Sequence, residues 1–199
     1  MINKEHTFNN KNCMKKNILF IHGGGYGGYE ADKELVASLQ KLVGNEYHIR
    51  YPEILSDESV SDYGWTKQIG TKILNTKSNV ILVGHSFGAS MILKYLSENS
   101  GNKTIKGIFL IATPFGDGNE DWQAGLKLHE NFAFKLPDKV PIYFYHCQDD
   151  EEVPFSQLDH YKQKLTNATF REIKSGGHQF NNDLTFVAND IIFLNDPIN

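Results

Sequence analysis

The sequence predicts an α/β protein in which a parallel sheet of about six strands carries helices on both faces. Two observations predict this class. Short, continuous apolar runs, typical of strands buried on both faces, alternate along the chain with segments whose apolar residues recur at helical spacing. No internal repeat or low-complexity linker interrupts the alternation. Because neighbouring parallel strands need a crossover connection, usually a helix, the pattern indicates a mostly parallel sheet.

In the first half of the chain, residues 17–22 form the first apolar run, and a run of glycines follows at 23–28. The next segment predicts a helix with one apolar face, formed by Leu35, Val36, Leu39, Leu42 and Val43. Gly44 and Asn45 end this helix. Residues 47–51 predict a second strand, closed by Pro52, and residues 62–76 predict a second helix.

In the second half, we expect strands at residues 80–83, 105–112, 140–147 and 169–174, and helices at 87–98 and 154–165. A final helix is marked by Leu184, Val187, Ile191 and Leu194. Residues 113–137 differ from the rest, because they are acidic and only weakly helical. We interpret them as a short lid-like insertion in a single domain that spans residues 17–199.

The composition limits the classes of function. The chain has 199 residues, of which 40% are hydrophobic and 22% charged, which suits one globular domain with a core. The formal net charge of −4 gives no indication of a nucleic acid or an anionic membrane as partner. No apolar run approaches the roughly 20 residues that a membrane-spanning helix needs.

The N-terminal residues 1–16 are polar and lack the apolar core of a signal peptide, so we expect a disordered extension there. The chain has two cysteines, Cys13 and Cys147, and they form no disulfide framework. A reducing cytoplasm is the location that this cysteine usage favours.

The apolar run at residues 80–83 ends in Gly84-His85-Ser86-Phe87-Gly88. A Gly-x-Ser-x-Gly pattern between a strand and a helix has the form of a nucleophile elbow, a sharp turn that exposes the serine hydroxyl at the end of a sheet. The glycines leave room where β-carbons would clash. The N–H groups at the start of the helix point toward negative charge forming near Ser86. Because Gly-Ser loops that merely end a strand also match this pattern, a site needs further groups.

Four motifs together resemble the α/β-hydrolases, and in particular the small single-domain serine hydrolases related to retinoblastoma-binding protein nine. Besides the elbow, they are His22-Gly23-Gly24-Gly25, Asp150-Glu151-Glu152-Val153-Pro154 and Gly176-Gly177-His178, which follow the first, fifth and sixth predicted strands. The resemblance implies a minimal α/β-hydrolase fold with strand order 2-1-3-4-5-6. The two leading strands that are usual in the family are missing, and residues 1–16 have no counterpart.

The resemblance also implies a catalytic triad. Ser86 would be the nucleophile, and it needs a base that changes protonation near neutral pH, which favours histidine. Of the eight histidines, His178 lies in a loop after the last predicted strand, within the Gly-Gly-His motif. In the family the acid stands three residues before the valine, at Asp150, and Asp149 is the alternative if the loop is displaced by one residue. The order Ser86, Asp150, His178 is that of α/β-hydrolases.

Two backbone N–H groups would stabilise the oxyanion. The residue after the nucleophile, Phe87, supplies one. By the resemblance Gly24 supplies the other, with Gly25 as the alternative. Gly25 is also a candidate substrate contact, as is Trp122 in the insertion, where α/β-hydrolases commonly build lids.

Other site types fit the sequence less well. Gly23, Gly25 and Gly28 match the dinucleotide pattern G-x-G-x-x-G, with Glu53 as the distant acid, but this explains none of the triad residues. His146 and Cys147 near Asp149 suggest a zinc site, yet adjacent strand residues point to opposite faces. We therefore expect neither a metal nor a cofactor.

The sequence thus predicts a serine hydrolase (a carboxylesterase, EC 3.1.1) that cleaves small carboxylic esters through an acyl-enzyme. The short insertion predicts a shallow site that accepts short acyl chains. Two alternatives stay open. One is a protein-binding module on the same fold, and the other is an amidase, thioesterase or carbon–carbon hydrolase with the same triad.

Overall fold

A computed structural model describes residues 15–76, 79–99, 105–116 and 125–195. Its centre is a six-stranded sheet in which every neighbouring pair of strands is parallel, in the order β2-β1-β3-β4-β5-β6. The predicted fold class and strand order are confirmed. The strands are β1 (Lys16–Ile21), β2 (Tyr47–Arg50), β3 (Val80–His85), β4 (Ile105–Ile111), β5 (Ile142–Cys147) and β6 (Thr169–Ile173).

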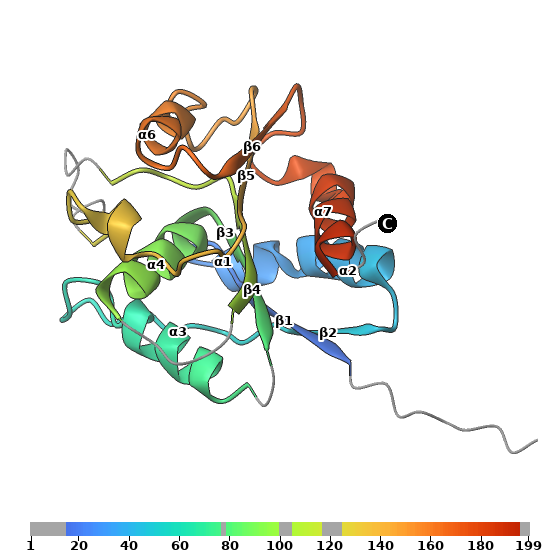
Figure 1. The fold of residues 1–199 in the computed structure, drawn as a ribbon, viewed down its shortest axis with the longest axis horizontal. Helices are drawn as coiled ribbons and strands as arrows, with labels where there is room; N and C mark the ends of the chain where they lie inside the picture. The colour runs from blue at the N-terminus through green and yellow to red at the C-terminus, as the bar shows by residue number, and fades with distance from the viewer. Residues whose placement is uncertain (1–14, 77–78, 100–104, 117–124, 196–199) are drawn as a thin grey trace, which may run out of the picture.

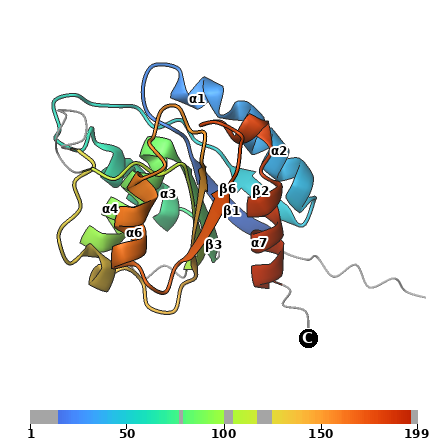
Figure 2. The same cartoon turned by 90° about the horizontal axis from the view of Figure 1, so that it is seen from above.

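Helices cover both faces of the sheet (Figures 1 and 2). On one face lie α3 (Trp65–Leu74), α4 (Ser86–Glu98) and α6 (Gln157–Lys164). On the other lie α2 (Lys33–Val43) and α7 (Thr185–Asn195). The other helical elements among the described residues are short: α1 (Gly28–Ala31) and the 3-10 turns η1 (Phe132–Lys135) and η2 (Phe180–Asn182). No described helix is both long and apolar enough to cross a bilayer.

The burial of β3 explains why the central strands are continuous apolar runs. All six of its residues are buried. Val80 and Leu82 pack into the core under α3 and α4, whereas Ile81 and Val83 pack into the core under α2 and α7. Burial of each such side chain contributes about 1.5–3 kcal/mol, so both faces of the strand must be apolar.

The structure differs from the expected boundaries at several points. The N-terminal extension was expected to include residue 16, but Lys16 is in β1 and pairs with Tyr47; residues 1–14 lie outside the described chain. The helix α1 follows a glycine-rich run that does not predict a helix. In the insertion, Leu126 and Phe132 pack into the core next to α4, and Trp122 lies outside the described residues.

The parallel arrangement brings the candidate site together. Because the carboxyl ends of all six strands meet at one edge, the loops after β1, β3, β5 and β6 leave from the same side of the sheet. β1 connects outward to β2 and β3 connects the other way to β4, so a crevice opens between the loops after β1 and β3.

Candidate active site

Ser86 occupies a tight turn between β3 and α4. Its φ of 50° lies in the left-handed region, which costs a non-glycine residue about 1–3 kcal/mol. Two close approaches make the flanking glycines necessary. A Cβ on Gly84 would lie 2.7 Å from Ala89 Cα, and a Cβ on Gly88 would lie 2.2 Å from the carbonyl oxygen of His22. The geometry is that of the elbow which the sequence predicts.

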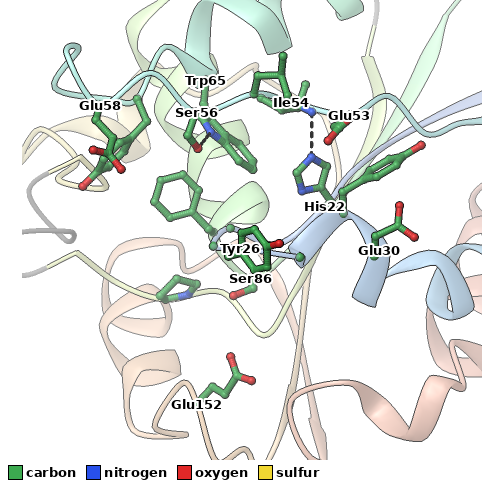
Figure 3. A pocket seen from close by; sticks show the side chains of 18 of the residues that line it. His22, Tyr26, Glu30, Glu53, Ile54, Ser56, Glu58, Trp65, Ser86 and Glu152 are labelled. Carbon is green, nitrogen blue, oxygen red and sulfur yellow. Dashed lines mark hydrogen bonds between the residues drawn. The ribbon is translucent and has the colours of Figure 1, made fainter.

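Ser86 lines a cavity of about 940 Å³ at the carboxyl edge of the sheet. Figure 3 shows Ser86 near the middle of this cavity, with His22 and Glu53 to one side, Glu58 to the other and Glu152 across from it. The walls combine aromatic rings with carboxylates. The aromatic rings are those of Tyr26, Tyr29, Tyr63, Trp65 and Phe87, and the carboxylates are those of Glu30, Glu53, Glu58 and Glu152.

His178 is 3% exposed and lies against Asp150. Its Nδ1 is 3.0 Å and 3.1 Å from the two carboxylate oxygens of Asp150. Because an ionised carboxylate only accepts hydrogen bonds, Nδ1 carries the proton and donates it. Nε2 is then the nitrogen that is free to act as a base, and the oxygen of Glu152 lies 3.6 Å from it.

Asp149 has a different set of partners. Its carboxylate accepts the backbone N–H groups of Gly176 and Gly177, at 2.9 Å and 3.0 Å. Gly177 has a φ of 61°, which glycine adopts without strain, and this bond holds the turn that leads into His178. Of the two candidate acids, Asp150 therefore contacts the imidazole, whereas Asp149 binds the loop backbone.

Asp150 is held by more than His178. It accepts hydrogen bonds from the backbone N–H of Val153 at 2.8 Å, and His146 Nε2 lies 3.2 Å from it. Burial opposes ionisation of Asp150, but hydrogen bonds from His146, His178 and Val153 outweigh it and keep the pKa of this carboxyl well below its usual range. Asp150 is thus a permanent anion near neutral pH. The sequence does not mark the role of His146, which is fully buried at the end of β5.

The pKa of His178 is raised above its ordinary value. Burial lowers this pKa, while the hydrogen bond to Asp150 and the charges of Asp150, Glu152 and Asp32 raise it by more. Within the described chain, Ser86 Oγ makes no hydrogen bond to His178. A catalytic hydrogen bond that is long or absent before substrate binds is common, so this does not remove His178 as the base.

We expect Glu152→Gln to shift the titration of the His178 ring to lower pH. The glutamate charge stabilises the imidazolium, so its removal lowers the pKa of His178 and the neutral ring persists to lower pH. Proton NMR of the ring during a pH titration measures this without a substrate. Glu58→Gln, a change in the same cavity, is the matched control. An unchanged or upward shift in Glu152→Gln would contradict the prediction.

The two predicted oxyanion donors lie next to each other. Phe87 follows Ser86 in the first turn of α4, where backbone N–H groups have no partner within the helix. A Cβ on Gly24 would lie 2.9 Å from Cβ and Cγ of Phe87, so only glycine allows the loop after β1 to approach the elbow this closely. Gly25 also lines the cavity.

The glycine run and the His, Cys, Asp and Glu side chains bear on the two other site types. The glycine run leads into the four-residue helix α1, and the Gly23 N–H donates to the carboxylate of Asp32 at 2.7 Å, so this amide is not available to a phosphate. No group of three or more His, Cys, Asp or Glu side chains among the described residues could hold a metal ion.

Sequence reasoning missed Asp32 and the role of His85. The ring of His85 lies against Asp32 and 4.8 Å from the ring of His178. Asp32 is 1% exposed at the junction of α1 and α2. A buried aspartate in a helical segment has no sequence signal that separates it from an exposed one.

Comparison with known proteins identifies a family and related folds. The family model described as serine hydrolase matches residues 32–190. Among solved structures, SOBER1 of Arabidopsis thaliana is 17% identical with a TM-score of 0.64, covering 92% of this chain and 100% of that one. Est1E of Butyrivibrio proteoclasticus is 15% identical with a TM-score of 0.63, and the match covers 92% of this chain and 88% of that one. The meta-cleavage product hydrolase CumD of Pseudomonas fluorescens IP01 is 14% identical with a TM-score of 0.72, and the match covers 92% of this chain and 92% of that one. A search of curated proteins finds no match.

Proposed function

The chain belongs to the serine hydrolase family, and from this premise we propose that it is a carboxylesterase of small carboxylic esters. The observation that carries the proposal is the pairing of a buried His178 with the Asp150 carboxylate, at the same sheet edge as the strained Ser86. Ser86 is the nucleophile, His178 the general base and acid, and Asp150 the residue that orients His178 and stabilises its imidazolium.

The reaction would proceed in two halves. Ser86 Oγ attacks the ester carbonyl carbon while His178 Nε2 takes the hydroxyl proton, and the N–H groups of Phe87 and Gly24 hold the resulting oxyanion. The tetrahedral intermediate collapses, the C–O bond to the alcohol breaks, and His178 gives its proton to the leaving oxygen. Water then attacks the acyl-enzyme with His178 again as base, which releases the acid and restores Ser86.

The cavity supports uncharged esters as substrates. Its carboxylates Glu30, Glu53, Glu58 and Glu152 would repel an anionic acyl or alcohol group, and no lysine or arginine is among the described residues that line it. Trp65 and Phe87, whose ring centroids are 4.9 Å apart, offer an apolar wall beside Ser86. The proposed substrate is therefore a neutral ester.

Labelling with a fluorophosphonate probe tests the proposal. We expect the wild-type protein to be modified at Ser86, as mapped by mass spectrometry, and Ser86→Ala to remain unmodified. Ser56→Ala, a serine change in the same cavity, should label like the wild type. Equal labelling of wild type and Ser86→Ala would refute the proposed nucleophile.

A panel of neutral esters, thioesters and amides then separates the alternatives. Fastest turnover of short neutral esters supports the carboxylesterase. Preference for thioesters, amides or a carbon–carbon bond would assign different chemistry to the same groups. Turnover of none of them, with the triad intact, would favour a protein-binding module.

A further inference from the structure

A buried hydrogen-bond network joins the three loops that carry the candidate catalytic groups. The Asp32 carboxylate accepts the Gly23 N–H at 2.7 Å, which fixes the start of the loop that bears Gly24. It also contacts His85 Nδ1 at 2.9 Å, directly before Ser86 in the elbow. Gln179 Nε2, next to His178, donates to the same carboxylate at 3.3 Å. Asp32 is thus in contact with all three loops.

His85 extends the network to His178 itself. Its Nε2 lies 3.1 Å from the backbone carbonyl oxygen of His178. Both His85 and Asp32 are 1% exposed, so water does not replace these contacts. None of the steps proposed above uses either side chain, although both contact the loops that carry the reacting groups.

The hydrogen-bond partners of His85 determine which of its ring nitrogens carry a proton. Nδ1 faces a carboxylate and Nε2 faces a carbonyl, and both of these groups only accept hydrogen bonds. Burial opposes ionisation of Asp32, but hydrogen bonds from His85, Gly23 and Gln179 outweigh it and hold its pKa below the ordinary value. The carboxyl therefore has no proton to donate to Nδ1. Only a ring with a proton on each nitrogen satisfies both acceptors.

We propose that Asp32 and His85, the latter with a proton on both ring nitrogens, are positioning residues that hold the oxyanion loop, the elbow and the His178 loop in register. The inference rests on the proposed function, because it assigns these residues a role in the same reaction. Asp32 fixes where the Gly24 N–H points, and His85 fixes the backbone of the general base.

The charges explain why the two residues act as a unit. Removing one partner of a buried ion pair leaves the other charge without compensation, so each depends on the other. A misplacement of about 1 Å in a catalytic group costs on the order of 10²-fold in rate. A network that spans all three loops therefore affects kcat more than substrate binding.

Four variants and a matched control test the role. We expect Asp32→Asn and His85→Ala each to lower kcat about 10²-fold with little change in KM. His85→Asn keeps a donor toward Asp32 and should recover part of the loss. The double variant Asp32→Asn/His85→Ala should lose no more than the worse single variant, because both remove one network. Asp190→Asn, whose carboxylate bonds to Tyr145 and Arg171 away from the cavity, should keep wild-type kcat.

Several results would contradict the positioning role of Asp32 and His85. Wild-type kcat in a folded Asp32→Asn protein, or losses that add in the double variant, would overturn the proposal. A rise in KM in place of a fall in kcat would do the same. If the wild type itself is not labelled at Ser86, the proposed function fails instead, and the network is then judged by the measurement below.

Imidazole ¹⁵N NMR of the wild-type protein needs neither a variant nor a substrate. We expect both nitrogens of His85 to bear protons in the folded protein, because each faces an acceptor, and both signals to change in Asp32→Asn. A single protonated nitrogen on His85 would refute the doubly donating ring. This readout also serves if Asp32→Asn does not fold, because the wild type alone then decides.

Discussion

Asp150→Asn is expected to lower kcat for ester hydrolysis about 10⁴-fold. The asparagine amide would donate toward His178 Nδ1, where the carboxylate now accepts at 3.0 Å. His178 would then carry its proton on Nε2, the nitrogen that must accept the proton of Ser86. The charge that stabilises the imidazolium would be lost as well. Because neither change touches the binding of substrate, we expect KM to stay within a few-fold of wild type.

Asp149→Asn is the matched comparison, one residue away. Its carboxylate accepts two backbone N–H groups and touches no catalytic side chain. An asparagine carbonyl can still accept one of these bonds, so the expected loss in kcat is below about 10-fold, with a fall in stability of about 1 kcal/mol. Steady-state kinetics and thermal unfolding of both variants check this. A loss in Asp149→Asn that equals the loss in Asp150→Asn would contradict the assignment.

The fold follows from the sequence because its dominant signal is burial. A strand such as β3, buried on both faces, must be apolar at every position, and the run at residues 80–83 shows this directly. The strand order does not follow from periodicity, which carries no information about which strands pair. It came from the resemblance carried by four short motifs, and the sheet confirms it.

The supporting groups of the site could not be predicted in the same way. Asp32 and His85 are 53 residues apart, and the contact between His85 and the His178 carbonyl spans 93 residues. Such contacts leave no local pattern, since their residue types are equally common on solvated surfaces. The choice between Asp149 and Asp150 had the same difficulty, because a turn can place either carboxylate toward the histidine. Only the path of the loop backbone decides which of the two carboxylates contacts the histidine.

Gly88→Ala is expected to leave little folded protein. The added Cβ would lie 2.2 Å from the carbonyl oxygen of His22 and 2.7 Å from that of Ile21, far inside contact distance. Both atoms belong to the backbone at the end of β1, which is fixed by pairing with β3. The helix α4 would have to move away from the sheet, and with it Ser86. We expect a loss of more than about 4 kcal/mol, a large part of the roughly 5–15 kcal/mol by which a typical domain is stable.

Gly70→Ala separates this backbone clash from the general effect of adding a methyl group. Its Cβ would lie 2.5 Å from Cε2 of Tyr95, but a half-buried ring can turn aside where a strand carbonyl cannot. Alanine also favours the helix α3 by about 1 kcal/mol over glycine. We therefore expect Gly70→Ala to remain folded and within about 1.5 kcal/mol of wild type. Circular dichroism and urea unfolding measure both variants, and a stable Gly88→Ala protein would show that the elbow can open without loss of the fold.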